Sequence, residues 1–314
     1  MRYASVRKRL LEVFSNAASF TMQQAYEAVP EKPQTTVRGR IYENVGKCFE
    51  KIARNTFRVS ANGCECILFE GNGRNPESLG IKSGSINLIV TDHPWADPKS
   101  LKGGNRNFAN YDTFRYTQED FVQKANLLAD GCFCVEILPA ESESNYQYLY
   151  EIKEMAAAAG LNYYASVDWK KGDFVANTGR KAKNTETVMI FVKGKARALR
   201  PDVKKDLAEP DVKHYMSGSK RMLPTQFDYP IVSKKDRLHQ AEKPLDLMLE
   251  IIDLLSMPGE WVLDQFAGSG VVGEACMKSD RNCYLIELCK ESVEKIVKRL
   301  HLVKDESLTD VGCA

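Results

Sequence analysis

The chain has 314 residues, of which 43% are hydrophobic and 27% are charged, and its formal net charge is +2. This length can bury one full α/β core and still carry a small additional domain, so we expect a globular protein. No apolar run approaches the ~18 residues of a membrane span, and the basic residues at 7–9 interrupt any signal-peptide pattern. We therefore expect a cytoplasmic protein that makes no membrane contact.

The cysteines and histidines do not form a metal-binding pattern. Nine cysteines are present without any Cys-x-x-Cys spacing, and the four histidines are scattered. Cys64 and Cys66, like Cys132 and Cys134, lie in apolar runs typical of strands. These cysteines are best interpreted as reduced core residues, and no metal site is predicted.

Residues 1–62 form a basic segment with its own pattern. They contain 11 Lys or Arg against 5 Glu and no Asp, a net charge of +6, whereas the remainder has 33 against 37, a net charge of −4. The spacing predicts helices over 6–14, over 22–28 and from Thr35 or Thr36 to about Val45, followed by two short strands within 48–60. A basic segment of this kind is a candidate for contact with phosphate.

Three helices followed by a strand pair resemble a winged helix. The stretch Thr-Val-Arg-Gly-Arg-Ile-Tyr-Glu-Asn at 36–44 resembles the recognition segment of winged-helix domains that are attached to restriction and modification enzymes. The resemblance implies a DNA-binding domain over 1–62. It places these residues against DNA, the last two on the wing: Arg38, Arg40, Lys47, Arg54 and Arg58. The alternative is a dimerisation module with a solvated charged face.

Residues 63–314 alternate between apolar strand patterns and helical patterns. Seven strands are expected at 65–69, 86–91, 132–138, 161–169, 187–193, 261–265 and 283–288. Helices are expected near 117–129, 142–159, 243–256, 271–279 and 290–303. The alternation predicts an α/β fold with a mostly parallel, doubly wound sheet. In such folds, ligands bind where strands end and the chain turns toward the next helix.

One strand end has the features of a nucleoside site. The strand in Trp-Val-Leu-Asp-Gln-Phe-Ala-Gly-Ser-Gly at 261–270 ends in a glycine turn, where Gly268 and Gly270 let the backbone approach a ligand closely. The next strand ends at Glu287, 17 residues after Gly270, where a carboxylate can accept hydrogen bonds from ribose hydroxyls. Because Gly273 completes Gly-x-Gly-x-x-Gly, these residues alone leave a dehydrogenase open.

A second strand end, Asp92-His93-Pro94-Trp95, carries groups that suit an aromatic amine. The lone pair of such an amine is delocalised into its ring. A carboxylate and a backbone carbonyl that accept its two hydrogens favour the tetrahedral nitrogen that attacks a methyl group. Asp92 and the carbonyl of His93 can serve in this way, and Trp95 can stack on the base. A strand-end Asp that caps a turn beside a core Trp is the structural alternative.

Both motifs resemble those of DNA amino-methyltransferases. Asp92-His-Pro-Trp resembles their catalytic motif Asp-Pro-Pro-(Tyr/Phe/Trp), and Asp264-Gln-Phe-Ala-Gly-Ser-Gly resembles their cofactor motif. The catalytic motif precedes the cofactor motif, which is the permuted order of the β group. The resemblance implies a Rossmann-like methyltransferase domain at 63–314, S-adenosylmethionine as cofactor, and a target-recognition region at 195–238. It implies that the cofactor contacts Asn72, Lys243, Asp264, Phe266, Gly268, Gly270 and Glu287.

Three positions depart from the family pattern. His93 stands where the catalytic motif has its first proline, Gln265 replaces the proline before Phe266, and Asn72 replaces a strand-end acid that contacts the cofactor adenine. None of these departures removes a group that methyl transfer requires. Any residue at position 93 provides a backbone carbonyl, and the amide oxygen of Asn72 can accept one hydrogen bond.

The resemblance implies methylation of N6 of adenine in duplex DNA, with the target base flipped out of the helix and no covalent intermediate. C5-cytosine methylation is disfavoured because the chain has no Pro-Cys nucleophile. N4-cytosine methylation is the first alternative, although relatives that act on cytosine usually have Ser in place of Asp92. Two further alternatives are methylation of adenine in RNA and a catalytically silent subunit that only binds DNA. DNA is the expected partner, and the sequence leaves a homodimer or a restriction partner open.

Overall fold

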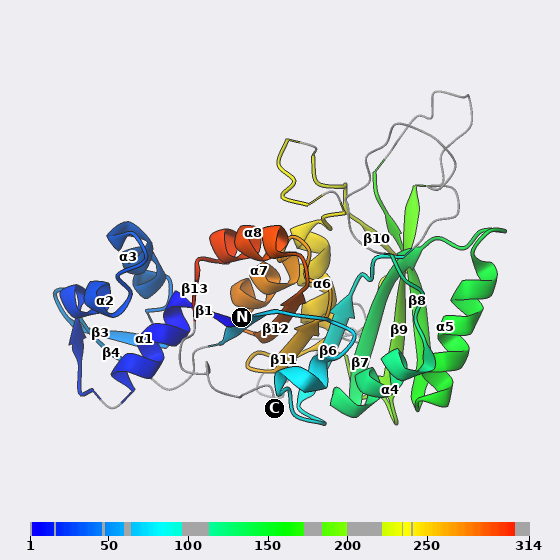
Figure 1. The fold of residues 1–314 in the computed structure, drawn as a ribbon, viewed down its shortest axis with the longest axis horizontal. Coiled ribbons are helices and arrows are strands. Elements are labelled where there is room, and N and C mark those ends of the chain that lie inside the picture. Colours follow the sequence, from blue (N-terminus) through cyan, green and yellow to red (C-terminus); the bar gives the residue numbers. More distant parts are fainter. Residues whose placement is uncertain are drawn as a thin grey trace, which may run out of the picture.

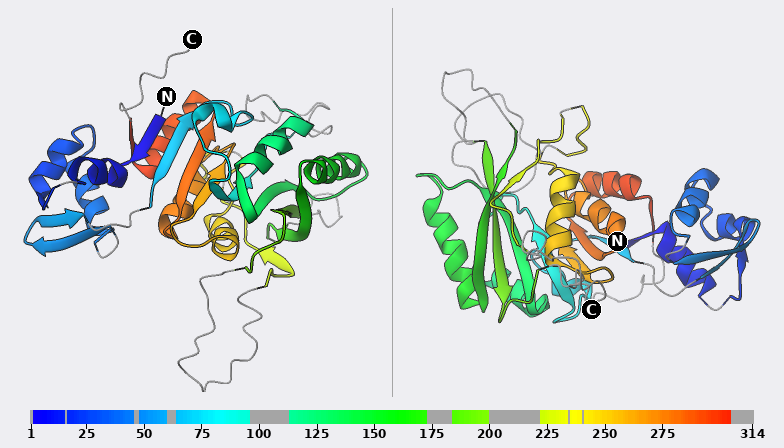
Figure 2. Two further views of the ribbon diagram at one scale, coloured as in Figure 1. Left: turned by 90° about the horizontal axis from the view of Figure 1, so that it is seen from below. Right: turned by 180° about the vertical axis from the view of Figure 1, so that it is seen from behind.

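The computed structural model describes residues 2–15, 17–45, 48–59, 64–95, 113–172, 184–199, 222–233, 235–239 and 241–304. A small N-terminal unit of helices and short strands stands at one end of a large sheet, which has helices on both faces (Figure 1). The views from below and from behind show the same arrangement (Figure 2).

The N-terminal unit contains the three helices that the sequence predicts. They are α1 (Val6–Phe14), α2 (Met22–Ala28) and α3 (Gln34–Tyr42). Ser5 caps α1 by accepting a hydrogen bond from the backbone N–H of Lys8 at 3.1 Å, and Thr21 forms a capping box at α2. The third helix ends at Tyr42, not near Val45 as expected. After Tyr42, the N–H of Asn44 bonds to the carbonyl of Ile41, three residues back. This tighter turn ends the α-helical pattern, in which bonds join residues four positions apart.

Short antiparallel strands complete this unit. The sheet has the order β2 (Phe20–Thr21), β4 (Thr56–Val59) and β3 (Phe49–Ala53). Asn55 has a φ of 56° and makes the turn between β3 and β4. Phe14, Phe20, Phe49 and Phe57 are buried beneath the helices and give the unit its own core.

The first residues of the chain belong to the large sheet instead of the N-terminal unit. β1 (Arg2–Ser5) pairs antiparallel with two strands of that sheet. The guanidinium of Arg7 donates to the side chain of Asn44 at 3.0 Å and to the carbonyl of Cys64. The ammonium of Lys8 bonds to Glu65 at 3.0 Å. Sheet pairing and buried contacts therefore cross the boundary that the sequence places at residue 62.

All seven predicted strands occur in the large sheet. They are β5 (Cys66–Glu70), β6 (Ile86–Thr91), β7 (Leu128–Pro139), β8 (Leu161–Lys170), β9 (Thr185–Lys193), β11 (Trp261–Asp264) and β12 (Asn282–Glu287). The expected total of seven is nevertheless wrong. β1, β10 (Gln226–Asp228) and β13 (Leu302–Lys304) bring the described part of the sheet to ten strands. These additional strands have three or four residues, which is too short for a recognisable strand pattern.

The sheet is mixed, with the order β10-β8-β9-β7-β6-β11-β12-β5-β1-β13. Its central strands β7, β6, β11, β12 and β5 are parallel, whereas β9 and β1 run antiparallel to their neighbours. Among the ten described strands only β9 and β1 are reversed, so the expectation of a mostly parallel sheet holds. Residues 302–303, expected at the end of a helix, belong to β13 because His301 has a φ of 54° and ends that helix.

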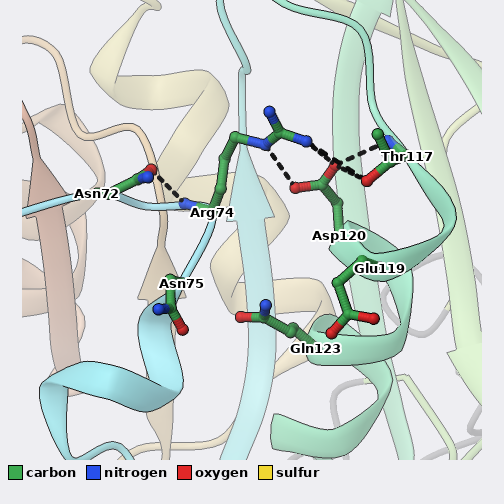
Figure 3. A pocket seen from close by; sticks show the side chains of 7 residues that line it. All are labelled: Asn72, Arg74, Asn75, Thr117, Glu119, Asp120 and Gln123. Carbon is green, nitrogen blue, oxygen red and sulfur yellow. Dashed lines mark hydrogen bonds and ion pairs between the residues drawn. The ribbon is translucent and has the colours of Figure 1, made fainter.

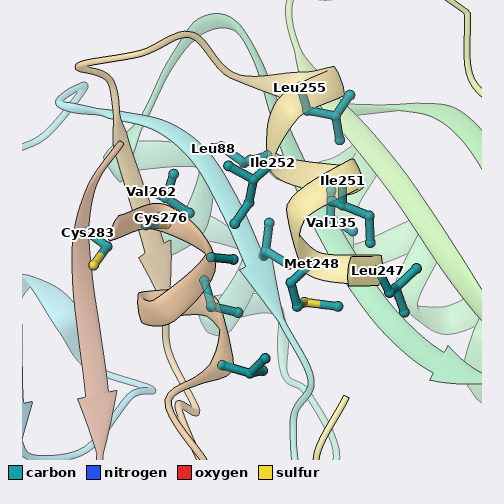
Figure 4. Close-up of a cluster of buried hydrophobic side chains, with 14 of the residues drawn as sticks. Leu88, Val135, Leu247, Met248, Ile251, Ile252, Leu255, Val262, Cys276 and Cys283 are labelled. Atoms are coloured by element: carbon teal, nitrogen blue, oxygen red, sulfur yellow. The ribbon is translucent and has the colours of Figure 1, made fainter. Parts of the chain in front are cut away.

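Helices cover both faces of the sheet. They are α4 (Gln118–Leu127), α5 (Tyr146–Ala158), α6 (Leu245–Leu255), α7 (Val271–Lys278) and α8 (Lys290–Leu300), with a short 3₁₀ helix, η1 (Pro76–Leu79). α6, α7 and α8 share one buried apolar cluster with residues such as Leu88 and Val135, part of which Figure 4 shows. α4 and α5 pack with Ile89 on the opposite face. The alternation of Leu88 and Ile89 follows from the two-residue period of a strand.

The parallel strands position the predicted site. β6, β11 and β12 lie side by side and point the same way, so their carboxyl ends meet at one edge of the sheet. Asp92 follows β6, Asp264 ends β11, and Glu287 ends β12. The three acids that the sequence selects are therefore neighbours.

Candidate active site

The carboxylate of Asp92 is held by a lysine from a distant part of the chain. Nζ of Lys243 lies 2.5 Å from Oδ2 of Asp92 and 3.5 Å from Oε2 of Glu186. Glu186 also pairs with Lys171 at 2.8 Å. Lys243 was expected to begin the helix beside the cofactor, but Pro244 caps α6 and the ammonium of Lys243 is directed to Asp92. Asp92, Lys243, Glu186 and Lys171 therefore form a chain of four charges of alternating sign.

The environment of Asp92 adjusts its proton affinity. Burial raises the pKa of Asp92 to about 6; Lys243 opposes this rise and Glu186 adds to it. Although burial works against it, the two carboxylates raise the pKa of Lys243 above its usual range. Asp92 is consequently ionised at neutral pH, yet it accepts a proton far more readily than an exposed aspartate does.

The loop after Asp92 is turned tightly. The carbonyl of His93 accepts the N–H of Trp95 at 2.8 Å, and the carbonyl of Pro94 accepts the N–H of Phe114 at 3.1 Å. The sequence predicts that the His93 carbonyl meets the target amine. A carbonyl oxygen has two lone pairs, so one of them remains available for that role. Trp95 is partly buried, as a stacking residue at the mouth of a site should be.

The glycine turn after β11 has the geometry that a close ligand needs. Gly268 and Gly270 have φ values of 51° and 77°, and Gly270 caps α7. A Cβ atom on Gly270 would lie 2.9 Å from Ile296. A Cβ atom on Gly273 would lie 2.6 Å from Leu285, so this third glycine serves the packing of α7 on the sheet. Gly273 is thereby explained without a dinucleotide.

Glu287 and the glycine turn are joined directly. Oε2 of Glu287 accepts the N–H of Gly268 and Oε1 accepts the N–H of Cys289, both at 2.8 Å. A carboxylate has about four acceptor positions, so these bonds orient the group and leave lone pairs for hydroxyls. Leu288, which sequence reasoning missed, is 70% exposed beside it and offers an apolar face. This set of groups fits a nucleoside.

Asp264 is the most deeply buried of the three acids. Its Oδ1 accepts the N–H of Phe266 at 3.1 Å and lies 3.5 Å from the hydroxyl of Thr91. Burial raises the pKa of Asp264 to about 8; the Phe266 N–H opposes the rise, and the charges of Asp92 and Glu287 add to it. Asp264 therefore suits a cationic ligand, whose charge would replace the proton.

Asn72 lies at an open surface cavity of about 270 Å³, lined by polar residues, between the loop after β5 and α4 (Figure 3). The other lining residues are Arg74, Asn75, Thr117, Glu119, Asp120 and Gln123. The guanidinium of Arg74 binds both carboxylate oxygens of Asp120, at 2.8 and 2.7 Å, and fixes one wall. The amide oxygen of Asn72 accepts the N–H of Arg74 at 3.0 Å.

Phe114 joins the two motifs, although no pattern in the sequence pointed to it. Its ring centroid lies 5.5 Å from that of His93 and 5.4 Å from that of Phe266. The guanidinium of Arg74 lies 4.6 Å from the Phe114 ring on another side. Phe114, Glu186 and Lys171 escape prediction because each reaches the site from a different segment. An exposed apolar residue directly after a strand-end acid, as at Leu288, is a signal that could have been used.

The predicted DNA-contacting residues of the N-terminal unit differ in their surroundings. Arg38 is exposed on α3, and its guanidinium lies 5.7 Å from the Tyr42 ring, which Lys51 approaches to 5.6 Å. Arg54 is exposed at the turn between β3 and β4. Two others form surface ion pairs of 2.5 Å: Arg40 with Glu43 and Arg58 with Glu50. Lys47 lies outside the described residues.

The ends of the segment 195–238 are anchored in the core of the large sheet. Arg197 pairs with Glu260 at 2.5 Å, and Leu199 is buried. β10 extends the sheet beside β8. Residues 200–221 and 234, the middle of the expected target-recognition region, lie outside the described residues.

No helix in the described part of the chain is long and apolar enough to cross a bilayer. The described residues also contain no group of three or more His, Cys, Asp or Glu side chains that could hold a metal ion.

Two curated relatives resemble parts of this chain. The type II methyltransferase M.Cfr9I of Citrobacter freundii is 44% identical over 62 residues, which cover 20% of this chain and 21% of that protein. The chain thus matches about a fifth of the length of M.Cfr9I. The type II methyltransferase M.HpaI of Haemophilus parainfluenzae is 24% identical over 228 residues, which cover 70% of this chain and 69% of that protein.

Two solved structures share the fold. The complex of M1.HpyAVI with S-adenosylmethionine has a TM-score of 0.52 and 22% identity, covering 74% of this chain and 98% of that one. The PvuII cytosine-N4-specific DNA methyltransferase has a TM-score of 0.53 and 16% identity, covering 78% of this chain and 88% of that one. Residues 86–298, which contain both motifs, match the N6/N4 methyltransferase family described as DNA methylase. The chain therefore belongs to this family of amino-methyltransferases, whose cofactor is S-adenosylmethionine.

Proposed function

We propose that the protein methylates N6 of adenine in duplex DNA. The observation that carries this proposal is the anionic Asp92 at the end of β6, held by Lys243 and followed by Pro94 and Trp95. Aspartate at this position, where relatives acting on cytosine usually have serine, favours adenine over N4 of cytosine.

The side chains at this edge have separate tasks. Bound S-adenosylmethionine supplies an electrophilic methyl group. The Asp92 carboxylate and the free lone pair of the His93 carbonyl accept the two amine hydrogens of a flipped-out base, and Trp95 stacks on its ring. Because its pKa is about 6, Asp92 can also take the proton that the methylated amine loses.

The cofactor residues follow the same edge of the sheet. Gly268 and Gly270 allow close approach of the chain, and Glu287 accepts hydrogen bonds from ribose hydroxyls. Asp264 and Phe266 face the methionine end. Asn72, at its polar cavity, accepts one hydrogen bond from the adenine amine. The fit rests on the oriented Glu287 carboxylate and on the positive φ angles of Gly268 and Gly270, which shape the turn beside it.

Assay of the full-length protein with labelled S-adenosylmethionine tests the activity. Duplex DNA, single-stranded DNA and RNA are offered in parallel, and the product is digested to nucleosides for mass spectrometry. We expect N6-methyladenine from duplex DNA. N4-methylcytosine or methylated RNA would replace the proposed substrate by one of the alternatives. DNA binding without any transfer would indicate a silent subunit. Long-read modification mapping in cells that express the protein would then give the recognised site.

We further propose that residues 1–62 bind DNA as a winged helix and that 195–238 contact the target sequence. Exposed Arg38 and Arg54, and the cations around Tyr42, support the first part. Combined Arg38→Ala and Arg40→Ala substitutions should lower DNA affinity and reduce the salt slope by about 2 if both residues meet phosphate. Arg9→Ala, an exposed change on α1, is the matched control. An unchanged slope would favour a dimerisation module.

A further inference from the structure

The imidazole of His93, at the position where the family motif has proline, is buried beneath the catalytic loop. The residue is 1% exposed, and its ring centroid lies 4.0 Å from that of Tyr116. Its Nε2 lies 2.8 Å from the hydroxyl of Tyr148, which is on α5. The side chain thus extends away from the loop into the layer between the sheet and α5.

The hydrogen bonds around Tyr148 define how His93 is held. The Tyr148 hydroxyl oxygen accepts the backbone N–H of Tyr116 at 3.0 Å, so its own proton is available for Nε2 of His93. Burial and the charge of Lys124 lower the pKa of His93 well below its usual range. The imidazole is therefore neutral at neutral pH, and Nε2 shares one hydrogen bond with the Tyr148 hydroxyl, whereas Nδ1 is buried without a partner among the described residues.

A buried ion pair holds the other side of this assembly. The Tyr116 hydroxyl donates to Glu136 at 2.8 Å, and the fully buried ammonium of Lys124 bonds to the same carboxylate. Glu136 lies on β7 opposite Thr91, the residue before Asp92. The ammonium of Lys124 also lies 3.7 Å from the centre of the Tyr116 ring. His93 is consequently anchored to groups that are themselves fixed in the core.

We propose that His93 is a positioning residue whose buried side chain, anchored on Tyr148 and Tyr116, restrains the catalytic loop as proline does in the family motif. Proline restrains a loop by locking its own φ angle. His93 achieves the restraint through its hydrogen bond to Tyr148 and its ring contacts with Tyr116 and Phe114. Asp92 and Trp95 flank this anchor, so it fixes the direction in which both meet the base. The inference rests on the proposed methyl transfer.

Single-turnover rates of three full-length variants on duplex DNA test this role. His93→Ala should lower the rate about 10- to 100-fold, because a shift of about 1 Å in a reacting group costs that much. Cofactor affinity should remain within a few-fold of wild type. His93→Pro should recover most of the rate that His93→Ala loses. Tyr148→Phe should lower the rate about 3- to 10-fold and have a smaller effect once His93 is alanine, since both changes break the bond between His93 and Tyr148. The effect that remains should come from the Tyr116 N–H, which loses its acceptor. Tyr150→Phe, an exposed hydroxyl removed from the same helix, is the control.

Two further readouts separate positioning from other roles. The pH–rate profile of the variants should keep the shape of the wild-type profile, because a neutral anchor does not titrate in the assay range. Hydrogen exchange of residues 86–95 in the free protein should speed up in His93→Ala and be slower again in His93→Pro. The inference is overturned if His93→Ala turns over like wild type, if His93→Pro is as slow as His93→Ala, or if the loss appears in KM for DNA or in base choice. An inactive wild-type protein would instead refute the proposed function, and the exchange data would still test the anchor.

Discussion

Two neighbouring strand ends of this sheet hold their acids in different ways. Glu287, at the end of β12, is oriented by backbone N–H groups of Gly268 and Cys289. Asp92, after β6, is held by the side chain of Lys243, which is itself shared with Glu186. One end is built from local backbone, and the other from charges that converge from distant segments.

The difference matters for the proposed function, because that proposal gives the two ends different tasks. A cofactor site needs a fixed shape that accepts hydroxyls, and a glycine turn with an oriented carboxylate provides it. A catalytic acid needs a controlled proton affinity, and nearby charges adjust that property without touching the substrate. Substitutions at the Asp92 end should therefore change rates and pH profiles, whereas substitutions at the Glu287 end should change cofactor affinity.

The largest effect is expected from Asp92→Ala. Loss of the carboxylate that accepts the amine hydrogen should lower the single-turnover rate about 10³-fold or more. Cofactor affinity, measured by calorimetry, should stay within a few-fold because the Asp92 carboxylate does not meet the cofactor. Turnover near the wild-type rate would remove Asp92 from the mechanism. A large loss of cofactor affinity would mean that the two strand ends are not separate.

Lys243→Met should have the second largest effect. Without the ammonium, Asp92 stands beside Glu186 alone, so its pKa should rise further above about 6. The protonated fraction at pH 7 then increases. We expect the rate at pH 7 to fall by about 10²-fold and the acidic limb of the pH–rate profile to move to higher pH, so that part of the loss disappears at pH 9.

Two companion variants test this explanation. Lys243→Arg keeps the positive charge and should leave the acidic limb near its wild-type position. Adding Glu186→Gln to Lys243→Met removes the repelling carboxylate and should move the limb back toward lower pH. If the limb stays in place in Lys243→Met, the ammonium does not govern the ionisation of Asp92.

The strand end that is built from local backbone was also easier to predict from the sequence than the one that is built from distant charges. The glycine turn, Glu287 and the strands of the sheet centre depend on residues close together in the chain, and the structure contains each of them where expected. The link between Lys243 and Asp92 spans 151 positions, so no local pattern reveals it. The same reason explains why Glu186 and Phe114 were missed.

The edges of the fold were predicted less well than its centre. β1 was assigned to the N-terminal unit because four residues carry no recognisable strand pattern, yet pairing with β5 and β13 places it in the large sheet. Arg7 and Lys8 look like free basic residues in the sequence, but they bond to Cys64 and Glu65 in the structure. The sheet to which β1 belongs and the partners of Arg7 and Lys8 depend on residues far away in the sequence, so local patterns do not reveal them.

At the other strand end, Glu287→Ala should weaken cofactor binding by about 1.5 to 3 kcal/mol, the usual contribution of a hydrogen bond to a charged group. The N–H groups of Gly268 and Cys289 also lose their acceptor. Glu287→Gln retains one acceptor oxygen, so its cofactor affinity should lie between that of the wild type and that of Glu287→Ala. Calorimetric binding that is unchanged in Glu287→Ala would place the ribose elsewhere.

The last expected effect is a pH dependence of cofactor affinity that arises from Asp264, and it is small close to pH 8. Because its pKa is about 8 in the free protein, Asp264 is mostly protonated at pH 7. S-adenosylmethionine carries a sulfonium and an α-ammonium, and positive charge beside a carboxyl favours its ionised form. Binding should therefore lower the pKa of Asp264 and release a proton.

The sign of the pH effect follows from this release. A ligand that displaces a proton binds more weakly as the pH falls below the pKa of that group in the free protein. As the pH falls below 8, Kd should therefore rise about tenfold per pH unit, until the pH reaches the lower pKa that Asp264 has in the complex. Above pH 8 the affinity should level off. Calorimetry from pH 6 to 8.5, in buffers of different ionisation enthalpy, counts the released proton directly. Asp264→Asn cannot titrate and should bind with a flat profile. A wild-type profile that is equally flat would show that Asp264 does not meet the cationic end of the cofactor. It would then be a buried acid that supports the turn through the N–H of Phe266.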